Sequence, residues 1–270
     1  MTKKLLKFSL IFVSLYLYFT VKTLFNPFIN KDYIVFLNVG NGDSILIASG
    51  GQYMVLDGGT SSYSLNNLYK YTNYTFPQNY IISHFHSDHI SGFYNFLTSN
   101  NTFYDIYMPH SYAQNEEYKK LFKNFLNSQL VKPLKSGDTI KLNNLKIVIL
   151  WPKQKCNYSK DENYCSLVVL VSKNNGSDSV LLTADTTKQA QASYVDNINK
   201  NIALIKVPHH GSENALNKDL IKKITPKYAV FTVDENSFGH PHQRVVNYYE
   251  SLGIRFFKTS ASGDIVYFFD

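Results

Sequence analysis

A short run of histidines and one aspartate holds the densest set of chemically active side chains in this sequence. His84, His86, Asp88 and His89 lie within six residues, in the pattern H-x-H-x-D-H. Imidazole and carboxylate are side chains that zinc and other transition metals bind readily. Because alternate side chains of an extended segment point to the same side, His84 and His86 can share one metal ion. Asp88 and His89 can reach a second ion, so the spacing indicates a metal site rather than a loop rich in histidine by chance.

Three more candidate ligands follow two other apolar runs of strand character. Asp185 follows one run, and its carboxylate can bridge two ions because each oxygen can bind one. Acidic residues also end strands at ordinary surfaces, so Asp185 alone carries little weight. His209 and His210 follow the second run and precede Gly211, where the missing side chain permits a close approach of the backbone. This pair strengthens the prediction of a metal site.

A third polar cluster, Gly239-His240-Pro241-His242, stands just before a predicted helix. The amino-terminal end of a helix favours anions, so His240 and His242 could bind a phosphate or a carboxylate. The same residues are also typical of helix capping, with Pro241 in the first turn. Both interpretations remain open from the sequence.

The strands and helices that must position these residues follow from apolar periodicity and turn residues. Helices are predicted over 64–71, 88–98, 114–126, 187–195, 214–224 and 241–252, most clearly over 114–126. Strands are predicted over 33–39, 44–48, 53–56, 80–83, 105–108, 145–150, 167–171, 180–183, 202–207, 228–233, 254–257 and 265–269. Since helices are interspersed among strands and the ligands lie at strand ends, we expect an α/β (α+β) protein. Its two sheets would carry helices on both outer faces, in four layers.

The first thirty residues differ from the rest in charge and hydropathy. Three lysines precede fourteen uncharged residues, 8–21, and Lys22 follows them. A bilayer span needs roughly twenty residues, a length that 5–25 reaches if the flanking lysines extend to the two interfaces. The lysines predict a cytoplasmic N-terminus. We therefore expect an anchor helix and linker over 1–30 and a body, 31–270, outside a bacterial cell membrane. A cleaved signal that gives a secreted body is the alternative.

Composition limits what the body can be. Hydrophobic residues make up 44% of the chain and aromatic residues 15%, which is typical of a globular protein rather than a disordered one. The net charge is +7, but four lysines lie in the first thirty residues, so the charge supports nucleic-acid binding only weakly. Cys156 and Cys165 could close a short loop in an oxidising compartment, or they could be unrelated thiols.

Six motifs stand in a characteristic order along the chain. They are N-V-G-N-G-D-S at 38–44, L-D-G-G at 56–59, the histidine motif at 84–89, L-T-A-D at 182–185, V-P-H-H-G-S at 207–212 and F-G-H-P at 238–241. Together they resemble the metallo-β-lactamase superfamily, specifically the hydrolase-like domain of the ComEC/Rec2 DNA-uptake proteins. The resemblance covers about residues 33–270 and implies an αββα sandwich with one or two metals at the sheet edges.

The resemblance implies roles for individual residues. The implied metal ligands are His84 and His86 at a first ion, Asp88 and His89 at a second, Asp185 as the bridge, and either His209 or His210 at the second ion. Asp57 would lie behind the ligands and orient a histidine, and Asp43 would support the site in a similar way. Asp88 would orient the nucleophile, His240 would stabilise developing charge, and Ser212 and His242 would join His240 in binding substrate.

The sequence departs from the superfamily pattern at one potential ligand. A further histidine is usual between the first motif and the bridging aspartate, but this interval contains only His110, which lies too early for that position. The matching segment is Glu162 to Leu167, without a histidine. The first site would then be completed by water or bind weakly, so one or two ions are expected. Mixed histidine and carboxylate ligands suit Zn²⁺, with Mn²⁺ as the alternative.

The resulting prediction is an extracytoplasmic, metal-dependent phosphoesterase or phosphodiesterase that uses a metal-bound hydroxide. Its substrate would be a phosphoester, with DNA as one candidate because of the resemblance to uptake proteins. The alternatives are a hydrolase of lactones or β-lactams and a non-catalytic binding module at the cell surface. The membrane is an expected partner through the N-terminal segment, and no protein partner is predicted.

Overall fold

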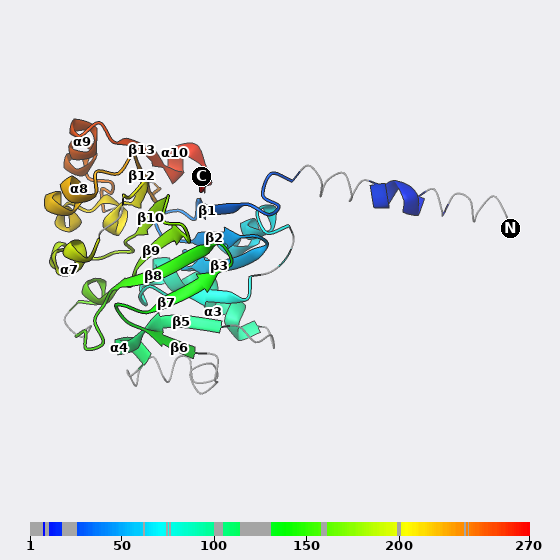
Figure 1. Cartoon of the computed structure of the whole chain (residues 1–270), viewed down its shortest axis with the longest axis horizontal. Helices are drawn as coiled ribbons and strands as arrows, with labels where there is room; N and C mark the ends of the chain where they lie inside the picture. The colour runs from blue at the N-terminus through cyan, green and yellow to red at the C-terminus, as the bar shows by residue number, and fades with distance from the viewer. Residues whose placement is uncertain are drawn as a thin grey trace.

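A computed structural model gives the structure of most of the chain. It describes residues 8, 11–17, 26–61, 63–73, 75, 77–99, 105–113, 131–157, 161–198, 201–234, 236 and 238–270. The helix predicted over 114–126 lies outside these residues. The chain forms two sheets that lie against each other, with helices around them (Figure 1).

The first sheet contains most of the N-terminal half of the chain and one C-terminal strand. Its seven strands are arranged in the order β14-β1-β2-β3-β4-β5-β6. Strands β14, β1, β2 and β3 are antiparallel neighbours, while β3 to β6 run parallel. The strands are β1 Asp32–Phe36, β2 Ile45–Ser49, β3 Gln52–Leu56, β4 Asn79–Ile81, β5 Asp105–Pro109, β6 Val131–Leu134 and β14 Ile265–Phe268.

The second sheet repeats this plan. Its seven strands have the order β13-β12-β11-β10-β9-β8-β7, in which β7 to β10 are antiparallel and β10 to β13 are parallel. The strands are β7 Thr139–Leu142, β8 Leu145–Trp151, β9 Val168–Lys173, β10 Ser179–Leu182, β11 Leu204–Lys206, β12 Tyr228–Phe231 and β13 Arg255–Lys258. In both sheets, therefore, an antiparallel meander leads into parallel strands whose carboxyl ends meet at one edge.

Helices follow the parallel strands and pack on the outer faces. They are α2 Tyr63–Asn66, α3 Ser87–Ser99, α4 His110–Ala113, α7 Lys188–Tyr194, α8 Lys218–Ile224, α9 Gln243–Ser251 and α10 Thr259–Ser262, with 3-10 turns η1 Asn67–Lys70, η2 Asn163–Cys165, η3 Val195–Asn197, η4 Pro208–Gly211 and η5 Glu213–Ala215. Figure 1 shows α7, α8 and α9 grouped beside the second sheet and α3 beside the first.

Two hydrophobic clusters explain why the sheets stack. Alternate residues of a strand point to opposite faces. In β1, Ile34 joins the cluster between the sheets, where it shares the core with Ile147 of β8, while Val35 joins the outer cluster with Phe93 of α3. All four side chains are at least 99% buried. Strands that are apolar on both faces need cover on both, so the predicted two-sheet α/β fold is confirmed.

Two strands of the structure were not predicted. β6 and β7 each lie at the edge of a sheet, and both are short. Pro133 lies within β6, where it cannot donate a hydrogen bond, and proline is tolerated only at such an edge. The strand pattern was therefore too weak to be detected in the sequence.

One predicted helix begins later than expected. The prediction started at residue 214, but α8 begins at Lys218 because Asn217 caps it. The Asn217 side chain accepts hydrogen bonds from the backbone nitrogens of Asp219 and Leu220. Asparagine is a favoured N-cap residue, so it stops the helix from extending backwards.

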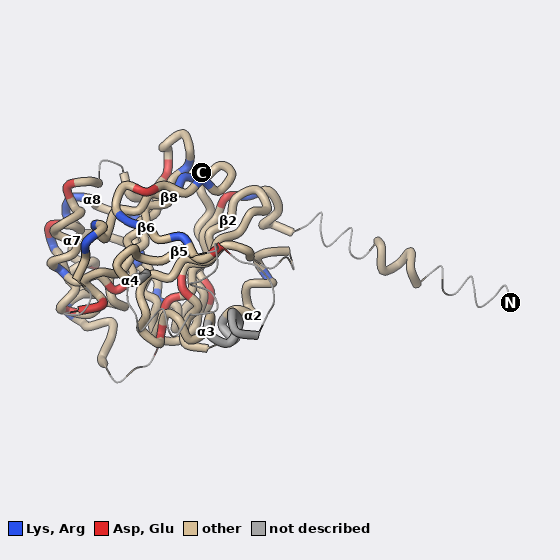
Figure 2. Tube along the Cα trace, turned by 90° about the horizontal axis from the view of Figure 1, so that it is seen from below, with Lys and Arg blue, Asp and Glu red and all other residues tan. Residues whose placement is uncertain are grey.

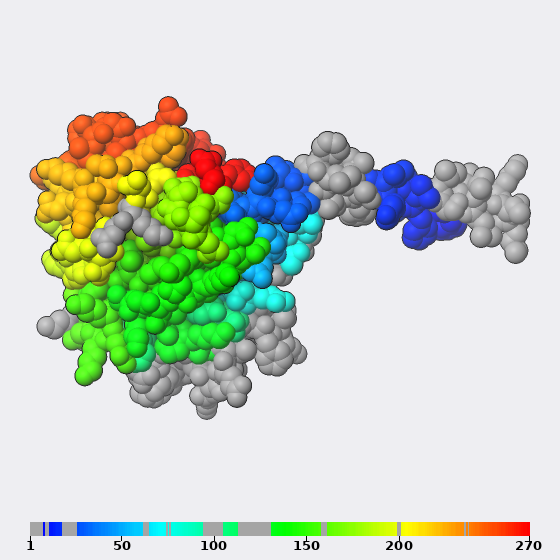
Figure 3. All heavy atoms as spheres, in the orientation of Figure 1, coloured from blue at the N-terminus to red at the C-terminus, as the bar shows by residue number. Residues whose placement is uncertain are grey.

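The N-terminal segment is described only in part. Residues 11–17 are helical and exposed, and they stand away from the folded body (Figure 3). Within the part of the chain that the structure describes, no helix combines the length and the apolar character that crossing a bilayer requires.

Candidate metal centre

The carboxyl ends of parallel strands from both sheets bring the predicted ligands together. β4 leads to His84 and to the start of α3, which contains Asp88 and His89. In the second sheet, β10 leads to Asp185, and its parallel neighbour β11 leads to His210. The ligands are far apart in sequence, but the two sheet edges place them in one cluster.

Four of these side chains form a tetrad with the spacing of metal ligands. Atoms bound to zinc at about 2.1 Å, at the corners of a tetrahedron, lie about 3.4 Å apart. His210 Nε2 lies 3.3 Å from Asp185 Oδ2 and 3.4 Å from Asp88 Oδ2. His89 Nε2 lies 3.4 Å from Asp185 Oδ2 and 3.8 Å from Asp88 Oδ2. One donor atom from each residue lies within 4.8 Å of the others, which fits a single ion.

Unpaired nitrogen atoms also fit a metal. Among the described residues, Nε2 of His84, His89 and His210 is buried without a hydrogen-bond partner. Buried polar atoms nearly always have a partner, so three unpaired nitrogens in one cluster need an explanation. A divalent cation would satisfy them, and the mixture of imidazole and carboxylate donors suits zinc, manganese or iron.

Hydrogen bonds fix which nitrogen of each histidine faces the cluster. His89 Nδ1 donates to Asp57 Oδ2 at 2.7 Å. His210 Nδ1 donates to the carbonyl oxygen of Thr232, in the chain after β12, at 2.8 Å. With the proton on Nδ1, the lone pair of Nε2 points into the cluster, as a metal ligand requires.

Electrostatics show that the cluster attracts positive charge. Burial lowers the pKa of His210, but the carboxylates of Asp185 and Asp88 together outweigh it and raise that pKa to about 9. Burial also lowers the pKa of His89, while Asp185 and Asp57 raise it well above its ordinary value. Burial raises the pKa of Asp185, but the neighbouring His210, His89 and Lys206 hold it well below its ordinary value. The directions of these shifts show that the carboxylates favour positive charge at this cluster.

Lys206 is the main site residue that the sequence did not reveal. Its side chain is fully buried, and Nζ lies 2.6 Å from Asp43 Oδ2 and 3.3 Å from Asp185 Oδ1. Asp43 also accepts a hydrogen bond from Thr232 Oγ1 at 2.6 Å. Because Lys206 holds Oδ1 of Asp185, only Oδ2 faces the histidines. Oδ2 is therefore the Asp185 oxygen that is placed to hold a metal, whereas the sequence suggested that each of the two oxygens could bind one ion.

The other half of the predicted site is less complete. His84 and His86 lie next to each other, with ring centroids 4.7 Å apart, and the His84 ring is 4.1 Å from that of His89. His209 Nε2 lies 3.7 Å from Asp185 Oδ2, but 30% of its side chain is exposed. Of the two histidines that the sequence could not separate, His210 therefore belongs to the tetrad and His209 lies at its rim.

The loop with His240 packs directly on the turn with His209. Gly211 has φ of 87°, and a β-carbon there would lie only 2.7 Å from Cβ of Pro241, so the contact requires glycine. The backbone nitrogen of His242 donates to the Gly211 oxygen at 3.0 Å. As a result, the His240 ring lies 5.6 Å from that of His209, at the rim of the site.

Ser212 and His242, which are predicted to bind substrate, also make structural contacts. His242 caps α9, because its Nδ1 accepts a hydrogen bond from the backbone of Arg244, and its Nε2 lies 3.3 Å from Glu213 Oε2. Ser212 is 7% exposed and its backbone nitrogen donates to the His209 oxygen. His242 is therefore a helix cap, which is one of the two roles that the sequence left open for it.

Replacing Asp57 with asparagine should weaken metal binding. The Asp57 carboxylate accepts hydrogen bonds from the Ser83 nitrogen at 2.7 Å, from Ser83 Oγ at 2.6 Å and from His89. An amide there would present N–H to His89 Nδ1 and move the histidine proton to Nε2, the metal-facing atom. We expect about a 10–100-fold loss of metal affinity, measured by competition with a chromophoric chelator. Asp105→Asn, at an exposed pair with Lys132 (2.6 Å), is the control and should bind metal normally.

Two facing sheets with a metal-ligand cluster at their strand ends define the metallo-β-lactamase fold. A family model described as "Anti-Pycsar protein Apyc1" matches residues 39–212, and the chain belongs to that family. The matched segment includes every member of the tetrad and ends before His240.

Curated relatives confirm the predicted relation to competence proteins. The chain is 25% identical over 256 residues to ComE operon protein 3 of Bacillus subtilis. The matched region covers 86% of this chain and 32% of that protein. It is 24% identical over 236 residues to the uncharacterized protein YcaI of Escherichia coli, and this match covers 84% of the chain and 28% of YcaI. The chain thus spans about a third of the length of these relatives.

Solved structures share the fold at low identity. YhfI of Bacillus subtilis, a metallo-β-lactamase fold protein, matches with a TM-score of 0.60 and 15% identity over 88% of this chain and 100% of its own. Tm1679, a metal-dependent hydrolase of the β-lactamase superfamily, matches with a TM-score of 0.55 and 13% identity over 86% and 98%. A diphosphatase from the PhnP family matches with a TM-score of 0.54 and 12% identity over 88% and 98%.

Proposed function

We propose that this protein is a metal-dependent hydrolase of phosphoester bonds. The observation that carries the proposal is the tetrad of Asp88, His89, Asp185 and His210, whose donor atoms lie within 4.8 Å of one another and whose two histidine Nε2 atoms are buried without a hydrogen-bond partner. His84 and His86 would bind a second ion beside it. Zn²⁺ is the ion that this donor set suits best, and Mn²⁺ is the alternative.

Besides the metal, hydrolysis needs a group that accepts a proton from water and a hydrogen-bond donor to the substrate, and Asp88 and His240 can supply them. A divalent ion at this site would lower the pKa of a water ligand to roughly 7 and act as a Lewis acid. Asp88 keeps 29% of its side chain exposed, so its carboxylate can accept a proton from an attacking water and orient it. Burial lowers the pKa of His240, so its neutral imidazole can donate a hydrogen bond to a substrate oxygen.

Two considerations favour a small phosphoester over DNA as substrate. One of the solved structures with this fold is a diphosphatase. Among the residues that the structure describes, lysine and arginine residues lie on several separate elements in this view, including β6, α7 and α8, rather than along one path (Figure 2). A DNA-binding surface needs such a path to contact successive phosphates.

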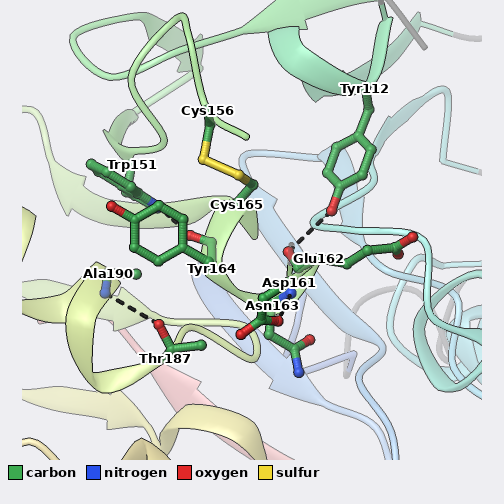
Figure 4. The surroundings of a disulfide bond; sticks show 10 residues. All are labelled: Tyr112, Trp151, Cys156, Asp161, Glu162, Asn163, Tyr164, Cys165, Thr187 and Ala190. Carbon is green, nitrogen blue, oxygen red and sulfur yellow. Dashed lines mark hydrogen bonds between the residues drawn. A yellow bond between two sulfur atoms is a disulfide. The ribbon is translucent and has the colours of Figure 1, made fainter. Parts of the chain in front are cut away.

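The body is proposed to lie outside the cytoplasm, anchored by residues 1–30. Support comes from the lysine-flanked apolar segment and from the disulfide between Cys156 and Cys165 (Figure 4), since disulfides persist in oxidising compartments.

The proposed function is tested by removing the metal and measuring whether added metal restores hydrolysis. The full chain, stripped with a chelator, should be inactive and should regain hydrolysis of bis-p-nitrophenyl phosphate when Zn²⁺ or Mn²⁺ is added. Linear DNA, nitrocefin and a lactone are assayed in parallel, and DNA cleavage would decline steeply with added salt. Bound metal without turnover of any substrate would identify a binding module and refute the proposal.

A further inference from the structure

A cleft opens between the two sheets at the ends of the strands that lie away from the metal centre. Its volume is about 760 Å³, which is in the range of ligand-binding pockets. It is lined by residues at the amino ends of β10, β11, β12 and β13 and by β14, whereas Asp185 and His210 follow the carboxyl ends of β10 and β11. The cleft is therefore separate from the proposed hydrolytic site.

The pleat of two edge strands decides which side chains face this cleft. In β13, Arg255 and Phe257 lie on one side, while Phe256 between them packs against the outer hydrophobic cluster. In β14, Ile265 and Tyr267 pack against the cluster between the sheets. Each of these strands is the last of its sheet, so no further strand among the described residues covers the opening.

Aromatic rings form much of the apolar lining. The rings of Tyr228 and Phe257 lie next to each other, with centroids 6.2 Å apart. From the other sheet, the Tyr267 hydroxyl donates to the Asp178 carboxylate, with 2.8 Å and 2.7 Å to its two oxygens. Phe257 and Phe268 are 36% and 42% exposed. Large apolar side chains that stay exposed around one cleft indicate a surface that binds an apolar group.

Two cations belong to the same lining. Lys227 Nζ lies 5.0 Å from the centroid of the Tyr228 ring, and the Lys227 carbonyl accepts a hydrogen bond from the Arg255 nitrogen at 3.3 Å. Within the described part of the chain, neither side chain has a carboxylate oxygen within 4.0 Å. The acidic residues of the lining are Asp178, which already accepts hydrogen bonds, and the exposed Asp270. The two cations are thus available to an anionic group beside the rings.

The N-terminal segment leaves the body next to this cleft. Phe28, just before β1, stacks on Phe268 with ring centroids 5.8 Å apart and 15° between the ring planes. Figure 3 shows the C-terminal strand, in red, beside the blue residues from which the segment extends. The helical part of the segment exposes apolar side chains, such as Phe12 at 69% and Tyr16 at 72%. Anchoring of this segment in a bilayer would therefore bring the cleft close to the lipid surface.

We propose that the cleft binds an anionic phospholipid of the bilayer, with the phosphate at Lys227 and Arg255 and an acyl chain along Tyr228, Phe257 and Tyr267. The inference rests on the proposed anchoring of residues 1–30 and not on the proposed hydrolysis. A lipid bound here would hold the body in one orientation on the membrane. The metal centre, at the other ends of the strands, would then face away from the bilayer.

Lipid selectivity of the full chain tests the proposal. Native mass spectrometry in a neutral detergent compares the anionic dimyristoyl phosphatidylglycerol with the zwitterionic dimyristoyl phosphatidylcholine at equal concentration. The anionic lipid should bind about 5-fold more tightly or better, and Arg255→Gln should remove about 5-fold of its affinity. Lys258→Gln loses the same charge from the same strand, but Lys258 Nζ lies over the Phe256 ring, at 6.0 Å, on the other face. This control should bind lipid like the wild type.

Two further measurements separate the cleft from the anchor and from other ligands. Wild type, Arg255→Gln and Lys258→Gln should float equally with phosphatidylcholine vesicles and melt at the same temperature, because anchor and fold are unchanged. Excess inorganic phosphate should not displace the lipid, since it lacks the acyl chain.

Equal affinity for the two lipids would overturn the proposal. Equal binding of the anionic lipid by Arg255→Gln and Lys258→Gln, or displacement of the lipid by phosphate, would also overturn it. If the wild type failed to float, the anchoring and this inference would both be refuted, while the hydrolysis assay would still judge the enzyme separately.

Discussion

Replacing Asp185 with asparagine should strip the metal from the centre and lower kcat/KM for a phosphodiester by on the order of 10³-fold or more. Oδ2 of Asp185 is the atom that the ligands share, at 3.3 Å from His210 Nε2, 3.4 Å from His89 Nε2 and 3.7 Å from His209 Nε2. No other carboxylate oxygen of the described residues has comparable contacts with three histidines. Loss of its charge should therefore affect both halves of the site.

Asparagine is the informative substitution because it keeps the shape of the side chain. The neutral amide can still receive a hydrogen bond from Lys206 through Oδ1, so the strand end should remain in place. What disappears is the negative charge that raises the pKa of His89 and of His210. Without that charge, Asp88 is the one carboxylate of the tetrad that remains beside two buried histidines and a buried lysine, so the centre should attract a cation less strongly.

Asp178 provides a matched control at the other end of the same strand. Asp178 precedes β10, is 8% exposed, and accepts hydrogen bonds from the Tyr267 hydroxyl at 2.8 Å and 2.7 Å. Asp178→Asn should retain full metal content and activity. Bound metal is counted on purified variants, and kinetics are measured with bis-p-nitrophenyl phosphate. Two ions bound tightly by Asp185→Asn would contradict the assignment of the bridge.

Most strand positions along the chain and most of the cluster were predictable because the signals are local. Each ligand follows an apolar strand directly, and parallel strands bring their carboxyl ends to one edge. Which of His209 and His210 joins the tetrad could not be predicted, because it depends on contacts with residues far away in the sequence. Both have positive φ, 49° and 53°, which only the tertiary contacts determine, and His210 is oriented by Thr232, 22 residues away.

The lysine that is buried at the site gave no signal in the sequence. Lys206 ends β11 between Ile205 and Val207 and has the pattern of an ordinary strand residue. Its partners come from distant turns, so only the folded chain shows that it is buried between two carboxylates.

Replacing Lys206 with methionine should destabilise the metal-free protein by about 3–5 kcal/mol, a large part of the stability of an ordinary domain. Burial lowers the pKa of Lys206, but Asp43 and Asp185 outweigh it and raise that pKa, so the ammonium is charged in the folded protein. Methionine fills similar space without charge. It would leave Asp43 with Thr232 as its remaining close partner and Asp185 without the donor on Oδ1.

Metal should partly reverse this loss, and that reversal separates an electrostatic role from simple packing. Urea unfolding is measured with chelator and with excess Zn²⁺. A bound cation next to Asp185 replaces some of the missing positive charge, so Zn²⁺ should stabilise Lys206→Met more than the wild type. Lys223→Met, at a surface pair with Asp196 (3.1 Å), is the control and should cost less than about 1 kcal/mol of stability with or without metal.

If Zn²⁺ stabilised Lys206→Met and the wild type equally, the lysine would serve the fold alone. A larger gain in the variant would show that the lysine and the metal neutralise the same carboxylate, which would explain why a lysine is buried in a site built for cations.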